Sequence, residues 1–326
     1  MRLRPAVLRR FLVTMMEPAQ PPAKRARPPD VLGDEMKRYE VETCAAAVNT
    51  ALPVVVRLDG HCFHTYTKGF DRPYDTRIHE AMVGTASDLL DHFGAVTAYT
   101  ESDEISLVFT PQTEEQASAI PFNGRVQKLV SVFAGYASAR FNAHMLRQPF
   151  EERQATLRAK VEKSDAHFDA RVFSLPSADR LVAYMRWRAV LDCRRNSVSM
   201  LAQAHFSAKE LHGVDAATCI AMLRDRKGVI WSETPPFFRF GTFVKKEAYT
   251  KAAFDRRLQK EVQARRTRVA ARSFALDEAE AAQFLLARVW PGEGPGSGVV
   301  VASEGEGQGG TARDGGGTAV APAPPE

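Results

Sequence analysis

The sequence predicts an α+β protein built on an antiparallel sheet with helices packed on one of its faces. Two observations lead to this fold class. Short β-branched and apolar runs alternate with two longer segments whose apolar residues recur at helical spacing. The order along the chain is strand, helix, strand, strand, helix, strand, which is the split βαβ order of ferredoxin-like folds.

In chain order, the predicted elements are a strand at 54–58, a helix at 73–93, strands at 96–100 and 105–109, a helix at 122–146 and a strand at 171–175. Pro73 suits the first turn of the first helix, and Pro176 ends the last strand. The second helix is expected to bury a stripe made of Val126, Val130, Phe133, Ala137 and Phe141.

Acidic residues stand at the edges of two predicted strands. Asp59 follows the first strand, while Asp103 and Glu104 precede the apolar run of the third. These two strands are neighbours at the centre of the predicted sheet, so Asp59 and Asp103 would lie within reach of a shared pair of divalent cations. Either motif alone is more often an ordinary turn with solvated carboxylates. Together with the residues around them, they favour an enzyme that acts on phosphates.

The surrounding segments carry a family resemblance. RLDGHCFHTY at 57–66 and SDEISLVF at 102–109 resemble the two metal motifs of the tRNA-His guanylyltransferase family, whose members add nucleotides to RNA 5′ ends in the 3′-to-5′ direction. The resemblance continues in the family's order through LGDEMKRYE at 32–40, GFDRPYD at 69–75, RVQKLVSVFAGYASARFN at 125–142, FDARVFSLPS at 168–177, YMRWRAVLDCRRNSVSML at 184–201 and KGVIWSETPPFFRFGTFVKK at 227–246.

The resemblance implies a polymerase palm over 31–180 and a mainly helical part over 181–290 that contacts RNA and triphosphate. It also implies two Mg²⁺ ions held by Asp59, Asp103 and the Gly60 carbonyl, with Glu104 as a further ligand or a supporting group. In the family reaction ATP or GTP activates a tRNA 5′-monophosphate, and the 3′-hydroxyl of an incoming nucleotide attacks it. Such catalysis depends mostly on positioning and charge neutralisation.

One segment departs from the branch dedicated to tRNA-His. Where that branch reads roughly His-x-x-Asn-Leu-Tyr-Asn-Thr after Asp-Cys, this chain continues from Arg194 to Ser199 as RRNSVS. This pattern is similar to the Thg1-like proteins, which repair truncated tRNA 5′ ends. We therefore expect templated 5′-end repair at the tRNA acceptor stem. The alternatives are a tRNA-His-specific guanylyltransferase, a nucleotide cyclase and an RNA-binding module with an inactive palm.

Further residues are assigned by the same resemblance. Those expected to bind the nucleotide are His61, Cys62, Phe63, His64, Lys68, Arg72 and Ser102. Those expected to bind RNA or triphosphate are Arg188, Arg194, Arg195, Asn196 and Ser197. Arginines of this kind also pair with a protein's own acids. The segment 245–272 holds ten basic and three acidic residues, which suits either a solvated helix or an RNA-binding surface.

Composition limits the remaining classes. No apolar run approaches the roughly 18 residues that span a bilayer, which predicts a soluble protein without a membrane partner. The four cysteines lack zinc-ligand spacing and are expected to be reduced and mostly buried. A net charge of +5 fits a polyanion partner without requiring one. The resemblance implies a homotetramer.

Both ends of the chain read as non-globular. Residues 1–16 contain four arginines and no acid, as in a mitochondrial transit peptide, and the basic segment 21–29 leaves a nuclear or cytoplasmic location as the alternative. Residues 1–30 are therefore expected to be a targeting or disordered segment. Residues 291–326 hold 11 of the 21 glycines and are expected to be a disordered tail.

Overall fold

A computed structural model describes residues 31–111, 120–255, 257 and 259–290. Helix α1 (Val31–Thr43) belongs to one compact unit, and the second unit begins at Cys44. The expectations for residues 1–30 and 291–326 lie outside the described residues. Within the part of the chain that is described, no helix is both long and apolar enough to cross a membrane.

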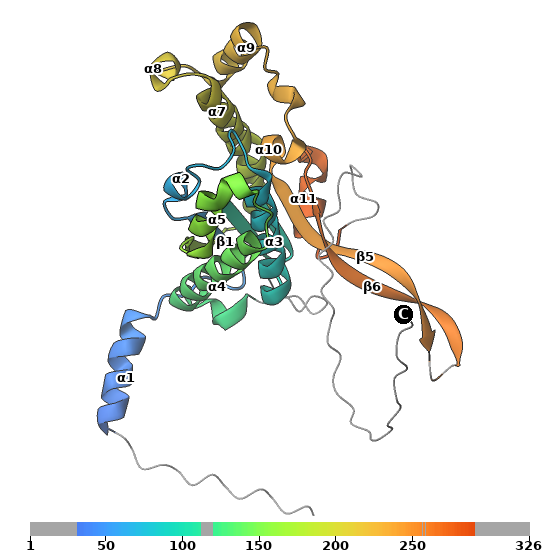
Figure 1. The fold of residues 1–326 in the computed structure, drawn as a ribbon. Coiled ribbons are helices and arrows are strands. Elements are labelled where there is room, and N and C mark those ends of the chain that lie inside the picture. Colours follow the sequence, from blue (N-terminus) through green and yellow to red (C-terminus); the bar gives the residue numbers. More distant parts are fainter. Residues whose placement is uncertain (1–30, 112–119, 256, 258, 291–326) are drawn as a thin grey trace, which may run out of the picture. The chain divides into compact units, whose positions relative to one another are not determined.

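A six-stranded antiparallel sheet organises the second unit (Figure 1). Its strands are β1 (Val54–Gly60), β2 (Thr97–Glu101), β3 (Glu104–Phe109), β4 (Phe168–Ser174), β5 (Thr242–Asp255) and β6 (Lys260–Arg272). They lie in the order β4-β1-β3-β2-β5-β6, so the first four strands show the ferredoxin-like arrangement. The prediction that the first and third strands are central neighbours is confirmed, because β1 pairs with β3 along its length.

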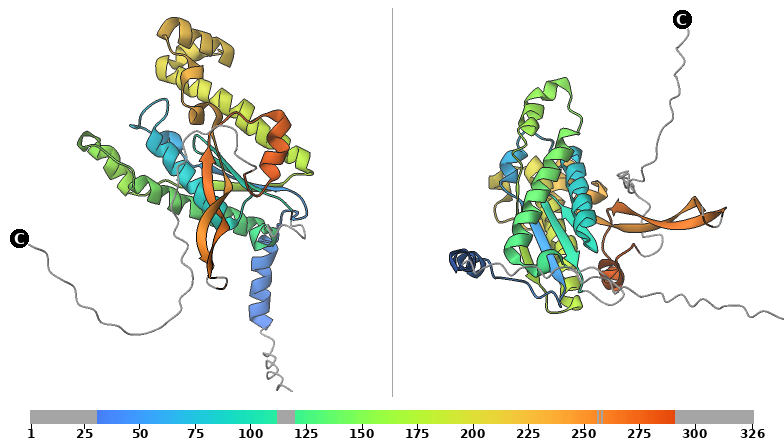
Figure 2. Two further views of the ribbon diagram at one scale, coloured as in Figure 1. Left: turned by 90° about the vertical axis from the view of Figure 1, so that its right-hand side faces the viewer. Right: turned by 90° about the horizontal axis from the view of Figure 1, so that it is seen from below.

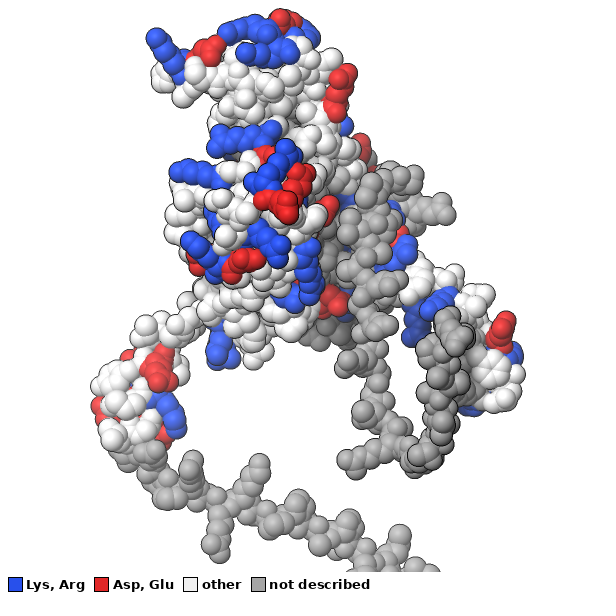
Figure 3. All heavy atoms as spheres, viewed as in Figure 1, with Lys and Arg blue, Asp and Glu red and all other residues white. Residues whose placement is uncertain are grey.

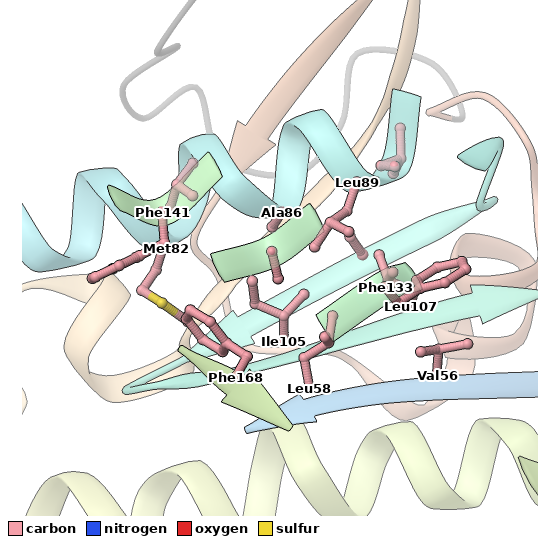
Figure 4. Packing of buried hydrophobic residues seen from close by; sticks show 14 of the residues in the cluster. Val56, Leu58, Met82, Ala86, Leu89, Ile105, Leu107, Phe133, Phe141 and Phe168 are labelled. Atoms are coloured by element: carbon pink, nitrogen blue, oxygen red, sulfur yellow. The ribbon is translucent and has the colours of Figure 1, made fainter. Parts of the chain in front are cut away.

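Helices α3 (Thr76–Phe93) and α4 (Val126–Leu146) cover one face of the sheet. Alternate residues of β1 and β3 point toward them, as Val56, Leu58, Ile105 and Leu107 show in Figure 4. From the helices, fully buried side chains fill the space above these strands; they include Met82, Leu89, Phe133 and Phe141. This contact forms the largest hydrophobic cluster and holds the strands in register.

The opposite face of the sheet is also covered, by elements that follow the palm in sequence. Val55, Tyr99 and Val108 pack against α6 (Ala178–Arg186), the π-helical turn η3 (Trp187–Asp192) and α11 (Glu278–Leu286). The expectation of helices on one face therefore holds only for the palm's own helices. The apolar runs of β1 and β3 are nearly continuous, which is typical of strands buried on both faces.

The C-terminal part is helical only in places. Its further helices are α7 (Cys193–His205), α8 (Ala208–Leu211), α9 (Ala216–Lys227) and α10 (Pro236–Phe240), with a 3₁₀ turn η4 (Trp231–Glu233). The interpretation of 245–272 as a solvated helix is wrong, since this segment forms most of the β5–β6 hairpin. Only 242–244 of β5 pair with β2, so the two strands continue past the sheet as a ribbon (Figures 1 and 2).

Both long helices begin later than the sequence predicts. Helix α3 begins at Thr76 because the Asp75 side chain accepts from the Arg77 amide and caps its first turn, while the Arg72–Pro73 bond is cis. A 3₁₀ turn η1 (Pro121–Gly124) precedes α4. The predicted stripe of α4 is wrong at Val126 and Val130, which are half-buried; Leu129 takes their place in the core.

Three short helical elements lie in the connections between the strands and the long helices of the palm. They are α2 (Phe63–Tyr66) after β1, and η2 (Glu152–Gln154) with α5 (Ala155–Glu162) between α4 and β4. The cysteines differ in exposure: Cys193 and Cys219 are buried, Cys44 is half-buried and Cys62 is exposed. The expectation of mostly buried thiols is therefore correct for two of the four.

Candidate active site

Asp59, Gly60 and Asp103 meet at one end of the sheet. Asp59 lies opposite Glu104 in the β1–β3 register, and Asp103 stands in the turn between β2 and β3, where Ser102 has a positive φ of 49°. The Gly60 amide donates to the Asp103 carbonyl at 3.0 Å, which ties the end of β1 to the turn. A Cβ at residue 60 would collide with the Phe63 ring, so glycine at this position lets that ring pack against the end of β1.

The two carboxylates influence one another. Burial raises the pKa of Asp103, and the charge of Asp59 raises this pKa further, while a hydrogen bond from Ser102 opposes the shift. The Ser102 hydroxyl lies 3.1 Å from Oδ1 of Asp103. Asp59 in turn lies 3.6 Å from Arg57 and 3.5 Å from Arg171. The end of the sheet therefore holds crowded negative charge that only nearby arginines offset.

Glu104 is engaged by arginines. Arg57 Nε donates to Glu104 Oε2 at 3.0 Å, and the guanidinium of Arg188 forms a close ion pair with the same carboxylate. Sequence reasoning missed Arg57, although a charge inside an otherwise apolar strand is a signal, because a buried charge requires a partner. Glu104 thus pairs with two arginines in this structure.

Arg188 lies inside the molecule, with 3% of its surface exposed. Besides Glu104, it contacts Glu101 at 3.4 Å and pairs with Asp192 four residues ahead in the π-helical turn. In this structure Arg188 pairs with the protein's own acids, and its assignment to RNA or triphosphate stays a prediction. A buried arginine with three carboxylates is a strongly coupled network, because each unpaired member would be costly.

Glu101 is a second residue that the sequence did not single out. It is 6% exposed, and burial raises its pKa while the charge of Arg188 opposes that shift. Its carboxylate accepts from the Tyr99 hydroxyl at 3.2 Å and from the Asn196 amide at 3.4 Å. Glu101 therefore connects the sheet to helix α7.

A cavity of about 370 Å³ opens beside Asp103. It lies between the segment 63–79, the β2–β3 turn, α7 and α10. Seven of the residues assigned from the sequence line it, namely Phe63, His64, Arg72, Ser102, Asp103, Asn196 and Ser197. The structure thus gathers three predicted segments that are far apart in the chain around one space.

Other assigned residues lie elsewhere. His61 stacks on His167 with ring centroids 4.9 Å apart, and the neighbouring Cys62 is exposed. Arg194 stands over the Trp231 ring, and Arg195 pairs with Asp192. The cavity wall includes neither these four residues nor Lys68.

One end of the cavity is aromatic, and sequence reasoning did not find it. Tyr74, His79, Phe237 and Phe238 line this end, and the rings of His79 and Phe237 stack with centroids 4.0 Å apart. Burial lowers the pKa of His79 to about 4, so the ring is neutral at pH 7. The four rings offer flat apolar surfaces, whereas Ser102 and Asp103 give another part of the cavity wall a polar character.

The donor set at the end of β1 suits a hard cation. Among the described residues, no group of three or more His, Cys, Asp or Glu side chains could hold a metal ion. Two carboxylates and a backbone carbonyl would leave the remaining positions to phosphate oxygens and water, as Mg²⁺ prefers. Burial and, to a smaller extent, the Asp59 charge raise the pKa of Asp103, and a cation bound there would favour the ionised carboxylate.

The palm sheet, the paired carboxylates and the adjoining cavity define a palm-type protein with a candidate site for phosphate chemistry. Residues 33–176 match the family model described as tRNAHis guanylyltransferase, Thg1. The chain is 34% identical to a bacterial tRNA(His) guanylyltransferase (Thg1)-like protein solved in complex with ATP, with a TM-score of 0.57 over 65% of this chain and 87% of that one. A complex with GTP gives 31% identity and a TM-score of 0.53 over 74% and 91% of the two chains.

The chain belongs to the tRNA-His guanylyltransferase (Thg1) family. It is also 33% identical to the uncharacterized protein R259 of Acanthamoeba polyphaga mimivirus, over 66% of this chain and 77% of that protein. Identity to the probable tRNA(His) guanylyltransferase of Mus musculus is 29%, over 50% of each chain. Identity to the Schizosaccharomyces pombe enzyme is 30%, over 44% of this chain and 51% of the enzyme. The chain thus spans about half the length of these two guanylyltransferases.

Proposed function

We propose that this protein adds nucleotides to the 5′ end of tRNA in the 3′-to-5′ direction, as a template-dependent nucleotidyltransferase that repairs or edits tRNA 5′ ends. The observation that carries this proposal is the cavity of about 370 Å³, because it joins the end of the sheet that bears Asp103 to the segment 63–79. Two solved structures of bacterial Thg1-like protein, similar in fold to this chain, are described as complexes with ATP and with GTP. The cavity is therefore assigned to the activating nucleotide.

In this proposal, Asp59, Asp103 and the Gly60 carbonyl would hold two Mg²⁺ ions. Bound there, the ions would activate the attacking hydroxyl and stabilise the leaving phosphate. The protein's own residues orient this site. Glu104 holds Arg57 and Arg188 in place, so its proposed role is that of the supporting group.

The cavity wall offers polar groups for the phosphates of a nucleotide and aromatic rings for its base. Among the polar residues of the cavity wall, Arg72, His64 and Ser102 would present donors for phosphate oxygens. At the aromatic end, the neutral His79 and its neighbours offer stacking surfaces for a base. A nucleoside triphosphate has the same division between a charged and a flat apolar half.

RNA contacts would come from basic surfaces outside the cavity. On the face shown in Figure 3, Lys and Arg side chains gather over α8 and α9, where Lys209, Arg224, Arg226 and Lys227 lie. The β5–β6 ribbon adds further exposed cations, among them Lys251, Arg265 and Arg266. Contacts between basic side chains and RNA phosphates give an affinity that depends steeply on salt concentration. They do not distinguish one nucleotide sequence from another.

The test uses tRNA transcripts that lack one 5′ nucleotide and carry several anticodons. We expect the protein to restore whichever nucleotide pairs with the opposite strand, regardless of anticodon, with ATP or GTP and Mg²⁺ present. Sequencing of the 5′ ends gives the answer. Addition of guanosine alone, and only to transcripts with the histidine anticodon, would support the tRNA-His-specific alternative that the names of the curated relatives favour.

A further inference from the structure

We propose that Lys160, on helix α5, is a positioning residue that holds the nucleotide-binding segment 63–72 in its binding conformation. This inference builds on the proposed function, because the segment supplies Phe63, His64 and Arg72 to the cavity. Lys160 itself does not line the cavity. It acts on the backbone behind the cavity wall.

The ammonium group of Lys160 gathers three carbonyls of this segment. Nζ donates to the carbonyl oxygens of Thr65 at 3.0 Å and Lys68 at 3.2 Å, and to that of Tyr66 at shorter range. It also stands 5.4 Å from the centre of the Tyr66 ring. An ammonium has three N–H donors, so three convergent carbonyls match its full capacity.

The segment needs such support because its own structure is short. Helix α2 has four residues, and the last carbonyls of a single turn lack partners within the helix. Cys62 precedes it with a positive φ of 54°, and Gly69 follows it with a φ of 93°. The segment's own backbone amides bind the carbonyls of Cys62, Phe63, Thr65 and Thr67. Lys160 adds donors to the carbonyls of Tyr66 and Lys68 and a second donor to that of Thr65.

Other residues of the same region hold the far end of the segment. A Cβ built on Gly69 would lie 3.2 Å from Leu157 of α5, so that side chain packs directly on the glycine. Gln154 accepts from Arg77 at 2.9 Å, and the guanidinium of Arg77 stands 4.8 Å from the centre of the Phe150 ring. Leu157 and Lys160 thus contact the segment at Gly69 and at 65–68, while Gln154 and Phe150 hold Arg77 at the start of α3, just after the segment. Among the residues named here, Lys160 is the one whose side chain donates hydrogen bonds to backbone carbonyls of the segment 63–72.

The surroundings of Lys160 make its ammonium group depend on the carbonyl oxygens that it contacts. Burial lowers the pKa of Lys160, and the nearby charge of Lys68 lowers it further. Both effects disfavour the charged form, so the ammonium depends on its carbonyl acceptors for stabilisation. Lys160→Met keeps the length and apolar stem of the side chain but removes all three donors.

The experiment compares three variants of the full chain. Lys160→Met removes the donors, Lys160→Arg keeps a positive charge with several donors, and Lys163→Met removes an exposed lysine of the same region as a control. Two quantities are measured: the dissociation constant for ATP, and the rate at which trypsin cleaves after Lys68 without nucleotide. Thermal melting of each variant reports whether the fold is retained.

We expect Lys160→Met to bind ATP about tenfold more weakly, a change of about 1.4 kcal/mol, and to be cleaved after Lys68 several times faster. Saturating ATP should suppress that cleavage. Lys160→Arg should recover most of both properties, and Lys163→Met should match the wild type. Unchanged cleavage in Lys160→Met, or faster cleavage with unchanged ATP affinity, would overturn the inference. A wild-type protein that binds neither ATP nor GTP would overturn the proposed function instead.

Discussion

At the scale of single residues, Lys245 shows how the interior sets a chemical property. Its side chain is fully buried, and Nζ donates to the carbonyls of Val96 at 3.0 Å and Ala287 at 2.5 Å and to the Thr97 hydroxyl at 2.6 Å. It thereby connects β5 to the start of β2 and to the end of α11. Burial lowers the pKa of this lysine to about 7.

The lowered pKa of Lys245 predicts a dependence of stability on pH. A lysine in the unfolded chain titrates near 10.4, so between pH 7 and 10.4 the unfolded state binds more protons and the free energy of unfolding rises with pH. The contribution is complete above 10.4 and is lost as the pH falls to 7. Measured by denaturant unfolding, the stability of the wild type relative to Lys245→Met should increase by up to about 1.4 kcal/mol per pH unit in this range. A pH-independent difference would contradict the burial argument.

The metal-site proposal makes its own residue-scale prediction. Asp103→Asn keeps the shape of the side chain but removes one of two neighbouring charges, so nucleotide addition should fall at least about 100-fold at saturating Mg²⁺. The melting temperature should stay the same or rise, because repulsion from Asp59 is relieved. Asp225→Asn, which changes an exposed residue, serves as the control. Activity within a few fold of the wild type would show that Asp103 is not a ligand.

At the scale of elements, helix α4 and the β5–β6 ribbon contrast in how they are stabilised. Helix α4 buries one stripe against the sheet, and its Phe133 ring stacks on Phe93 with centroids 3.9 Å apart. Beyond Lys246, the described residues of β5 pair only with β6, and this part of the ribbon carries mostly polar side chains. Burial therefore stabilises α4 far more strongly than it does the ribbon.

Two substitutions in neighbouring positions of α4 test this contrast. Phe133→Ala removes a fully buried ring and should lower the free energy of unfolding by about 3–5 kcal/mol. Val132→Ala, at a position 36% exposed, should cost less than about 1 kcal/mol. Denaturant midpoints at an unchanged m value would measure both. Equal losses would contradict the assignment of the stripe.

At the scale of the whole molecule, the palm is completed by segments that follow it in the chain. The second hydrophobic cluster joins Val55 and Val108 of the palm strands to Phe284 of α11 and to Trp290. The third cluster, which joins α7, α9 and α10, holds together the helices beside the cavity. The palm alone would expose the face of its sheet that bears Val55 and Val108, so residues 44–290 are expected to fold as one unit.

The basic N-terminal residues predict that the protein is imported into mitochondria. A fluorescent reporter fused to residues 1–30 should enter mitochondria, because a basic, acid-free and amphipathic segment is typical of transit peptides. Microscopy of the fusion gives the result, and a fusion with Arg2, Arg4, Arg9 and Arg10 changed to Glu is the control. A reporter that stays in the cytosol or enters the nucleus would reject the mitochondrial location.

The sequence by itself determined the order of the palm elements and the pairing of its carboxylate motifs. Periodicity is a local property, so the strands and the two long helices could be predicted to within a few residues. The split βαβ order then placed β1 beside β3, and with them Asp59 beside the turn that holds Asp103.

Only the tertiary structure decided which charges pair and what closes the cavity. On sequence grounds Arg188 could contact RNA or triphosphate or pair with the protein's own acids, and only the structure shows its ion pairs with Glu101, Glu104 and Asp192. The ribbon, the covered second face and the aromatic end formed with Phe237 depend on contacts between segments distant in the chain. Periodicity carries no information about such contacts, because it reports only which face of an element is apolar and not what will pack against it.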